Sequence, residues 1–99
     1  MSVLLAKFDE AISDADGALH LAQAVGRQRE EDGLWEGWLE FIPVKRTDKR
    51  LCSERETTQP NRPDLDYWAQ GLSRVYLQGA LGRAEGCAED IQDHRTGTL

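Results

Sequence analysis

The sequence predicts an α+β domain, in which an antiparallel β-meander of three to four strands is followed by two C-terminal helices packed on one face. Segments with an apolar period of two fill the first half of the chain, and segments with helical spacing fill the second half. Aspartate stands before glycine at residues 14–17 and 31–33, which is typical of the tight turns that join antiparallel strands. The length of 99 residues suits one domain over residues 1–89, and residues 90–99, which lack an apolar period, are predicted to be a loose tail.

The sequence predicts the secondary structure after the first turn more clearly than that of residues 2–12. Residues 2–12 fit either a strand or a helix, because Leu4, Phe8 and Ile12 also lie on a helical stripe. After the turn at residues 14–17, an alternating pattern continues to about residue 28 and predicts a strand.

The next predicted strand, residues 34–42, carries two of the three tryptophans. Successive side chains of a strand point to opposite faces, so its two faces can be compared. One face is purely apolar and should meet the core: Trp35, Gly37, Leu39 and Phe41. The other is mixed and should face outward: Leu34, Glu36, Trp38, Glu40 and Ile42. Pro43 has no amide proton to donate and should end the strand.

The second half begins with a charged loop over residues 44–50 and a polar outer strand over residues 51–58. A helix should start around Pro63, because proline is favoured in the first helical turn. Its apolar residues repeat at helical spacing: Leu65, Trp68, Ala69 and Leu72.

A second helix should follow without a long connection. Gly71 can end the first helix, and Ser73 can cap a second one that runs to about residue 85. Glycine is unfavourable inside a helix, so Gly79, Gly82 and Gly86 imply either a fraying helix or a close approach to another backbone, and we favour close packing against the sheet.

Composition narrows the class of protein. With 39% hydrophobic residues, 30% charged residues and no long apolar run, the chain should be soluble and not cross a membrane. The first seven residues lack the pattern of a secretory signal, so we expect a cytoplasmic location. Cys52 and Cys87 lack Cys-x-x-Cys spacing, and we expect two free thiols in a reducing cytosol.

Two longer patterns carry a resemblance. They are Asp-Gly-Leu-Trp-Glu-Gly-Trp-Leu-Glu-Phe at residues 32–41 and Glu-Thr-Thr-Gln-Pro-Asn-Arg-Pro-Asp-Leu-Asp-Tyr-Trp-Ala at residues 56–69. With shorter matches up to residue 81, the chain resembles a family of short uncharacterised bacterial proteins over about half of its length. The resemblance implies a bacterial origin and a shared fold, and it implies no activity.

The sequence contains no pattern that supports a cofactor, a metal site or a catalytic residue. Asp14 and Asp16 do not continue into a calcium loop, and His20 and His94 lack ligand spacing, so a local hydrogen bond is expected for His20. Glu36 and Glu40 lie roughly 13 Å apart along a strand, beyond the separations of about 5 to 9.5 Å of glycosidase carboxylates. They are expected on a solvated face, with arginine partners at position 27, 29 or 55.

The densest polar segment is residues 55–62, at the transition from strand to helix. It places five polar side chains between two arginines: Arg55, Glu56, Thr57, Thr58, Gln59, Asn61 and Arg62. These groups can satisfy backbone atoms and pair with Glu40 or Asp66, or they can bind a ligand.

The leading functional hypothesis is a small non-catalytic bacterial accessory protein that binds a protein partner or itself, with Trp38 as the anchor. The alternative is a small-ligand-binding protein or enzyme that uses residues 55–62 with Glu36 or Glu40. A third reading is weak nucleic-acid contact through a basic loop, which consists of Lys45, Arg46, Lys49 and Arg50. The net charge of −6 makes nucleic acid the least favoured partner.

Overall fold

The computed structural model describes residues 1–45 and 47–87. Within them the chain forms seven strands and two helices, which confirms the α+β class. The strands are β1 (Val3–Lys7), β2 (Ile12–Ser13), β3 (Leu19–Gln28), β4 (Trp35–Pro43), β5 (Leu51–Cys52), β6 (Thr57–Gln59) and β7 (Glu85–Gly86). The helices are α1 (Arg62–Gln70) and α2 (Arg74–Arg83). The predicted tail at residues 90–99 and His94 lie outside the described residues.

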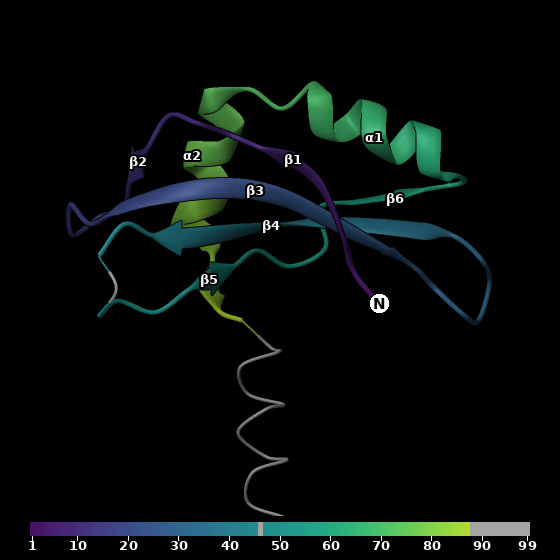
Figure 1. Ribbon diagram of the computed structural model, residues 1–99, viewed down its shortest axis with the longest axis horizontal. Helices are drawn as coiled ribbons and strands as arrows, with labels where there is room; N and C mark the ends of the chain where they lie inside the picture. The colour runs from purple at the N-terminus through teal and green to yellow at the C-terminus, as the bar shows by residue number, and fades with distance from the viewer. Residues whose placement is uncertain (46, 88–99) are drawn as a thin grey trace, which may run out of the picture.

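All seven strands belong to one antiparallel sheet, with the order β1-β3-β4-β5-β7. β2 pairs with β3, and β6 pairs with β4. The prediction of three to four strands is therefore wrong in number, because short strands at the edges add to the long central pair. Figure 1 shows this pair, β3 and β4, running side by side through the middle of the molecule.

Both tight turns form as predicted. The Asp14 carboxylate accepts hydrogen bonds from the backbone amides of Asp16 and Ala18, at 2.9 Å each, and Gly17 adopts a φ of +85°. Gly33 in the second turn has a φ of +75°, which only glycine adopts without strain. Before the first turn, residues 2–12 contain β1 and the start of β2 and form no helix.

The core unites residues of the central strands with residues of both helices. One cluster unites Ala22 and Ala24 of β3 and Leu39 and Phe41 of β4 with Ala69 of α1 and Leu77, Ala80 and Leu81 of α2. The predicted core face of β4 is confirmed at Leu39 and Phe41, which have no exposed surface. Trp35 departs from the prediction and is only partly buried, because it lies at the end of the strand, where the Arg62 guanidinium sits 5.6 Å from its ring centre.

Helix α1 approaches the sheet at a pair of glycines. Gly26 and Gly37 are register partners on β3 and β4, and a Cβ on Gly26 would lie 2.6 Å from Leu65 of α1. A Cβ on Gly37 would lie 2.7 Å from Trp68. The glycines of the close approach are thus in the strands and not in α2.

Close packing against the sheet, the favoured explanation for Gly79 and Gly82 of α2 and for Gly86 of β7, is wrong. A Cβ on Gly82 or on Gly86 would have no atom within 4 Å, and one on Gly79 would meet only the Arg83 side chain at 3.7 Å. The helix boundaries agree better with the sequence. Asn61 caps α1 by accepting from the Asp64 amide, and Ser73 caps α2 by accepting from the Tyr76 amide. Neither helix is long and apolar enough to cross a bilayer, among the residues that the structure describes.

Candidate functional site

A β-bulge opposite Trp38 divides the strand that was predicted over residues 51–58. The amide of Ser53 donates to the Leu39 carbonyl and the amide of Glu56 donates to the Gly37 carbonyl, each at 2.8 Å. Between the register pairs Glu40–Cys52 and Gly37–Thr57, four residues, 53–56, therefore stand opposite the two residues 38 and 39 of β4. The two extra residues interrupt the ladder and separate β5 from β6.

Trp38 lies on the opposite face of β4 from the core and is partly buried. The Arg27 guanidinium lies 6.0 Å from its ring centre, at the edge of cation–π range. Arg27 also donates a 2.8 Å hydrogen bond to Glu36, its register partner. Arg55 approaches the same carboxylate at 4.0 Å. The arginine partners predicted for Glu36 are therefore confirmed.

A groove of about 610 Å³ opens beside Trp38. Its lining combines the strand face, the bulge, the N-terminus and the last described residues: Met1, Ser2, Arg27, Glu36, Trp38, Cys52, Ser53, Glu54, Arg55, Glu85, Gly86 and Cys87. A second groove of about 490 Å³ shares four of these residues, Cys52, Glu54, Arg55 and Glu85, and extends to Glu56 and Arg83. The two grooves thus meet at the bulge, and we call them together the Trp38 groove.

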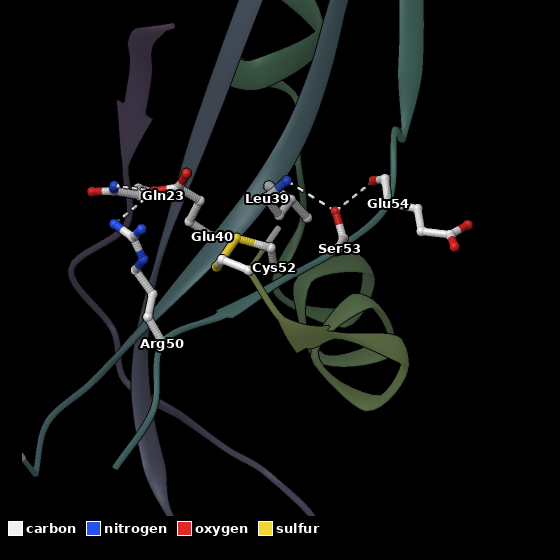
Figure 2. The surroundings of a disulfide bond; sticks show 8 residues. Gln23, Leu39, Glu40, Arg50, Cys52, Ser53 and Glu54 are labelled. Atoms are coloured by element: carbon white, nitrogen blue, oxygen red, sulfur yellow. Dashed lines mark hydrogen bonds and ion pairs between the residues drawn. A yellow bond between two sulfur atoms is a disulfide. The ribbon is translucent and has the colours of Figure 1, made fainter. Parts of the chain in front are cut away.

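Cys52 and Cys87 are joined by a disulfide, so the prediction of two free thiols is wrong. The pairing could not be predicted from the sequence, because the cysteines are 35 positions apart and no short motif connects them. Pairing of β5 with β7 brings the two cysteines together at one side of the Trp38 groove. Figure 2 shows the disulfide of Cys52, which joins β5 to the chain that follows α2. This bond fixes the groove wall to the sheet.

Glu40 contradicts the prediction of a solvated outer face, because only 5% of its surface is exposed. Its carboxylate accepts a 3.0 Å hydrogen bond from Gln23 and lies 3.9 Å from the Arg50 guanidinium (Figure 2). Cys52 is its register partner on β5. Glu40 is therefore a buried residue on the outer face of β4 and does not line the groove.

The polar residues 55–62 are not gathered at one place. Thr57 accepts a 2.7 Å hydrogen bond from Gln59, and the exposed Thr58 pairs through its backbone register with Glu36. Arg62 forms a 3.2 Å ion pair with Asp66, as one of the sequence-based alternatives predicted. Within this segment, Arg55 and Glu56 line the groove, whereas Thr57, Thr58, Gln59 and Arg62 do not.

Glu56 connects the bulge to α2. Its carboxylate accepts hydrogen bonds from the Tyr76 hydroxyl and, at 2.9 Å, from the Arg83 guanidinium. The hydrogen bond to Glu56 raises the pKa of the Tyr76 hydroxyl above its usual value of 10.0, because it stabilises the protonated phenol. Glu56 is therefore engaged within the fold and is not available as an acid or base.

Three charged side chains of the groove remain available to a ligand. Glu54 and Glu85 are exposed and make no ion pair or side-chain hydrogen bond within residues 1–45 and 47–87. Among the described residues, Arg55 has only the 4.0 Å approach to Glu36, which exceeds hydrogen-bonding distance. The groove thus offers two uncommitted carboxylates and one loosely held guanidinium around an aromatic ring.

The remaining titratable candidate, His20, lies away from the groove. It is buried, and its Nε2 lies 3.1 Å from the Asp14 carboxylate, which confirms the local hydrogen bond expected from sequence. This contact is the main reason that the pKa of Asp14 falls below its usual value of 3.8.

The basic loop is also only partly available. Arg50 points to Glu40, and Lys45 and Lys49 are exposed, while Arg46 lies outside the described residues. In the described part of the chain, no three His, Cys, Asp or Glu side chains are placed to hold a metal ion. No protein-family model, curated protein or solved structure matches this chain.

The predicted site residues thus separate into two groups. Trp38, Glu36 and Arg55 line the groove, whereas Glu40, Thr57, Thr58, Gln59 and Arg62 do not. Arg27, which the sequence identified only as a cross-strand partner, also lines the groove. Glu54 and Glu85 were missed as binding residues, because the bulge and the β5–β7 pairing that expose them depend on contacts between distant segments. The only sequence signal for the bulge is the unusual polarity of residues 53–56.

Proposed function

We propose that this chain is a small bacterial accessory protein that acts without catalysis, by binding another protein through the Trp38 groove. The observation that carries the proposal is the surroundings of Trp38, a partly buried aromatic side chain in a groove with charged residues at its rim. Aromatic anchors surrounded by polar residues are typical of the centres of protein interfaces.

The arrangement of the helices favours this surface. Residues of both helices join one cluster with the apolar face of β3 and β4. We infer that α1 and α2 cover this same face, which leaves the face of Trp38 for a partner.

The hydrogen bonds and ion pairs of the polar side chains argue against the catalytic alternative. Ser53 accepts a hydrogen bond from the Leu39 amide and donates to the Glu54 carbonyl, so its hydroxyl is not free to act as a nucleophile (Figure 2). Glu36 is paired with Arg27, and the residues of the polar segment 55–62 point to different places. A small-ligand function would have to use the same groove.

The disulfide is informative about the cellular compartment of the protein. Disulfides persist in oxidising compartments and are rare in the cytosol, so the Cys52–Cys87 bond argues against the cytoplasmic location that free thiols favoured. We propose an oxidising compartment. Trapping of thiols with a mass-tagged maleimide immediately after cell lysis tests this: the chain should gain no tag before reduction and two tags after it. Two tags before reduction would restore the cytosolic interpretation.

Selection of binders tests the groove. A displayed library of random peptides is selected against the wild-type protein, and the affinity of each enriched peptide is then measured for wild type and for Trp38→Ala. We expect enriched peptides whose affinity falls about tenfold or more in Trp38→Ala, the range of an interface anchor. Tyr67→Ala is the matched control, because Tyr67 is an exposed aromatic on α1 outside the groove.

The contrary outcome is a set of peptides that bind wild type and a folded Trp38→Ala variant equally. Light scattering of the same three proteins identifies the partner type. A loss of oligomeric mass in Trp38→Ala alone would mean that the partner is a second copy of the chain.

A further inference from the structure

The uncommitted carboxylates of the Trp38 groove are Glu54 and Glu85. Within the groove, Arg27 is engaged with Glu36 and Arg83 with Glu56. After these pairs are set aside, the two carboxylates stand with Arg55 and with the α-ammonium of Met1, which lines only the first part of the groove. Glu54, Glu85 and Arg55 line both parts, so the junction holds two carboxylates and one guanidinium. A basic side chain placed at the junction therefore meets an excess of negative charge.

Trp38 suits the same ligand. The face of an indole attracts cations, and the long aliphatic stem of lysine or arginine packs well against an aromatic surface. Arg27 already lies 6.0 Å from the ring centre, which shows a guanidinium against this ring within the fold. A second basic side chain from a partner could use the part of Trp38 that remains exposed in the groove.

The size of the groove favours a chain segment over a small cation. A volume of about 610 Å³, beside a second groove that shares four of its lining residues, is in the range that holds a ligand the size of several side chains. Nucleic acid is disfavoured by the two free carboxylates and by the net charge of −6. The same net charge attracts a basic protein from a distance and raises the rate of association.

We propose that the occupant of the Trp38 groove is a basic segment of a partner protein, which packs a Lys or Arg side chain on Trp38 and places its positive charge near Glu54 and Glu85. Arg55 acts as the selective element, because its guanidinium repels uniformly positive segments and favours those that interrupt the basic residues with an acidic or neutral one. This inference rests on the proposed function and names the chemistry of its partner.

The test uses fluorescein-labelled twelve-residue peptides and the full chain with its disulfide intact. Three peptides share one sequence of alternating leucine and charged positions, and the charged positions are lysine, glutamine or glutamate. Fluorescence anisotropy at low and at physiological salt gives the affinities. We expect the lysine peptide to bind at least tenfold more tightly than the glutamine peptide at low salt, with a smaller difference at higher salt, and the glutamate peptide to bind more weakly than either.

Charge variants at the groove sharpen the test. Glu54→Gln with Glu85→Gln should weaken the lysine peptide about tenfold, which corresponds to two partly exposed ion pairs, and leave the glutamine peptide unchanged. Arg55→Gln should strengthen the lysine peptide about threefold. Glu30→Gln with Glu31→Gln is the control, because it removes two negative charges from the exposed second turn outside the groove. An equal loss in this control would assign the effect to net charge and overturn the proposed contact.

The failure of this inference is distinguishable from the failure of the proposed function. If the display selection yields Trp38-dependent peptides that are neutral or acidic, the groove binds proteins and the basic occupant is wrong. If it yields no Trp38-dependent peptide and the lysine peptide binds wild type and Trp38→Ala alike, both proposals fail. Tighter binding of single-stranded DNA than of the lysine peptide at the same groove would also overturn the basic occupant.

Discussion

The two faces of strand β4 differ in what surrounds them, although both are built from one stretch of nine residues. On the inner face, Leu39 and Phe41 are completely buried against small residues of β3 and the helices. On the outer face, Trp38 lies in a groove between charged residues, and Glu40 is buried by a polar network. The inner face therefore determines the stability of the fold, whereas the outer face combines a smaller contribution to stability with accessible groups.

The largest expected effect is a loss of stability that differs between the two faces of β4. Phe41→Ala removes a fully buried ring and should lower the free energy of unfolding by about 3–5 kcal/mol. Trp38→Ala removes a larger side chain and should cost only about 1–2 kcal/mol, because the ring is partly exposed already. Urea unfolding followed by circular dichroism measures both. Equal losses would mean that Trp38 belongs to the core.

Loss of the disulfide should have the second-largest effect on stability. It closes a loop between residues 35 positions apart that contains both helices, and such a bond restricts the unfolded chain. Reduction should therefore lower the free energy of unfolding by about 2–4 kcal/mol. The variant Cys52→Ser with Cys87→Ala should show a similar loss and no further response to reductant. Unchanged stability on complete reduction would show that β5 and β7 hold the groove wall without the bond.

The contact between α1 and the sheet gives the next effect. Gly26→Ala places a Cβ 2.6 Å from Leu65 and 2.9 Å from the Glu36 carbonyl oxygen, and the backbone atom cannot move aside easily. We expect a loss of about 1–3 kcal/mol. Gly82→Ala is the matched control in open space and should stabilise α2 by up to about 1 kcal/mol. Thermal melts of both variants decide whether the strand glycines or the helix glycines are needed for close packing.

The smallest expected effect concerns the first turn and pH. The pKa of Asp14 is lowered in the fold, so its contribution to stability is present above its unfolded value of 3.8 and is lost as the pH falls through the lowered value. Wild type should therefore lose stability more steeply below pH 4 than His20→Asn, which lacks the imidazole whose hydrogen bond is the largest single cause of the lowered pKa. Asp16→Asn is the control, since the Asp16 carboxylate has no partner in the described ranges. Parallel slopes in denaturation curves from pH 2.5 to 6 would contradict the assignment.

Local chemistry made much of the fold predictable. Asp14 and Gly17 specify their turn through side-chain hydrogen bonds and a positive φ, and Asn61 and Ser73 specify helix starts, so these features appear where the sequence places them. The alternation over residues 34–42 gave the correct faces for Leu39, Phe41 and Trp38, because the period of a strand is fixed.

Other features depend on which segments meet. The burial of Glu40 follows from the position of Gln23 and Arg50 on neighbouring segments, and no pattern within residues 34–42 indicates it. The bulge at residues 53–56 depends on the pairing of both its ends with β4, and the Cys52–Cys87 bond depends on the pairing of β5 with β7. A strand that is apolar on one face and charged on the other does not reveal which of its charges will be covered.

The sequence alone determined the α+β class, the turns, the helix caps and the two faces around the tryptophans, because each follows from interactions between residues near one another in the chain. Only the tertiary structure decided that the cysteines are joined, that Glu40 is buried and that Glu54, Arg55 and Glu85 meet beside Trp38. These outcomes required the sheet to bring together strands from distant parts of the chain, and the groove exists only where those strands meet.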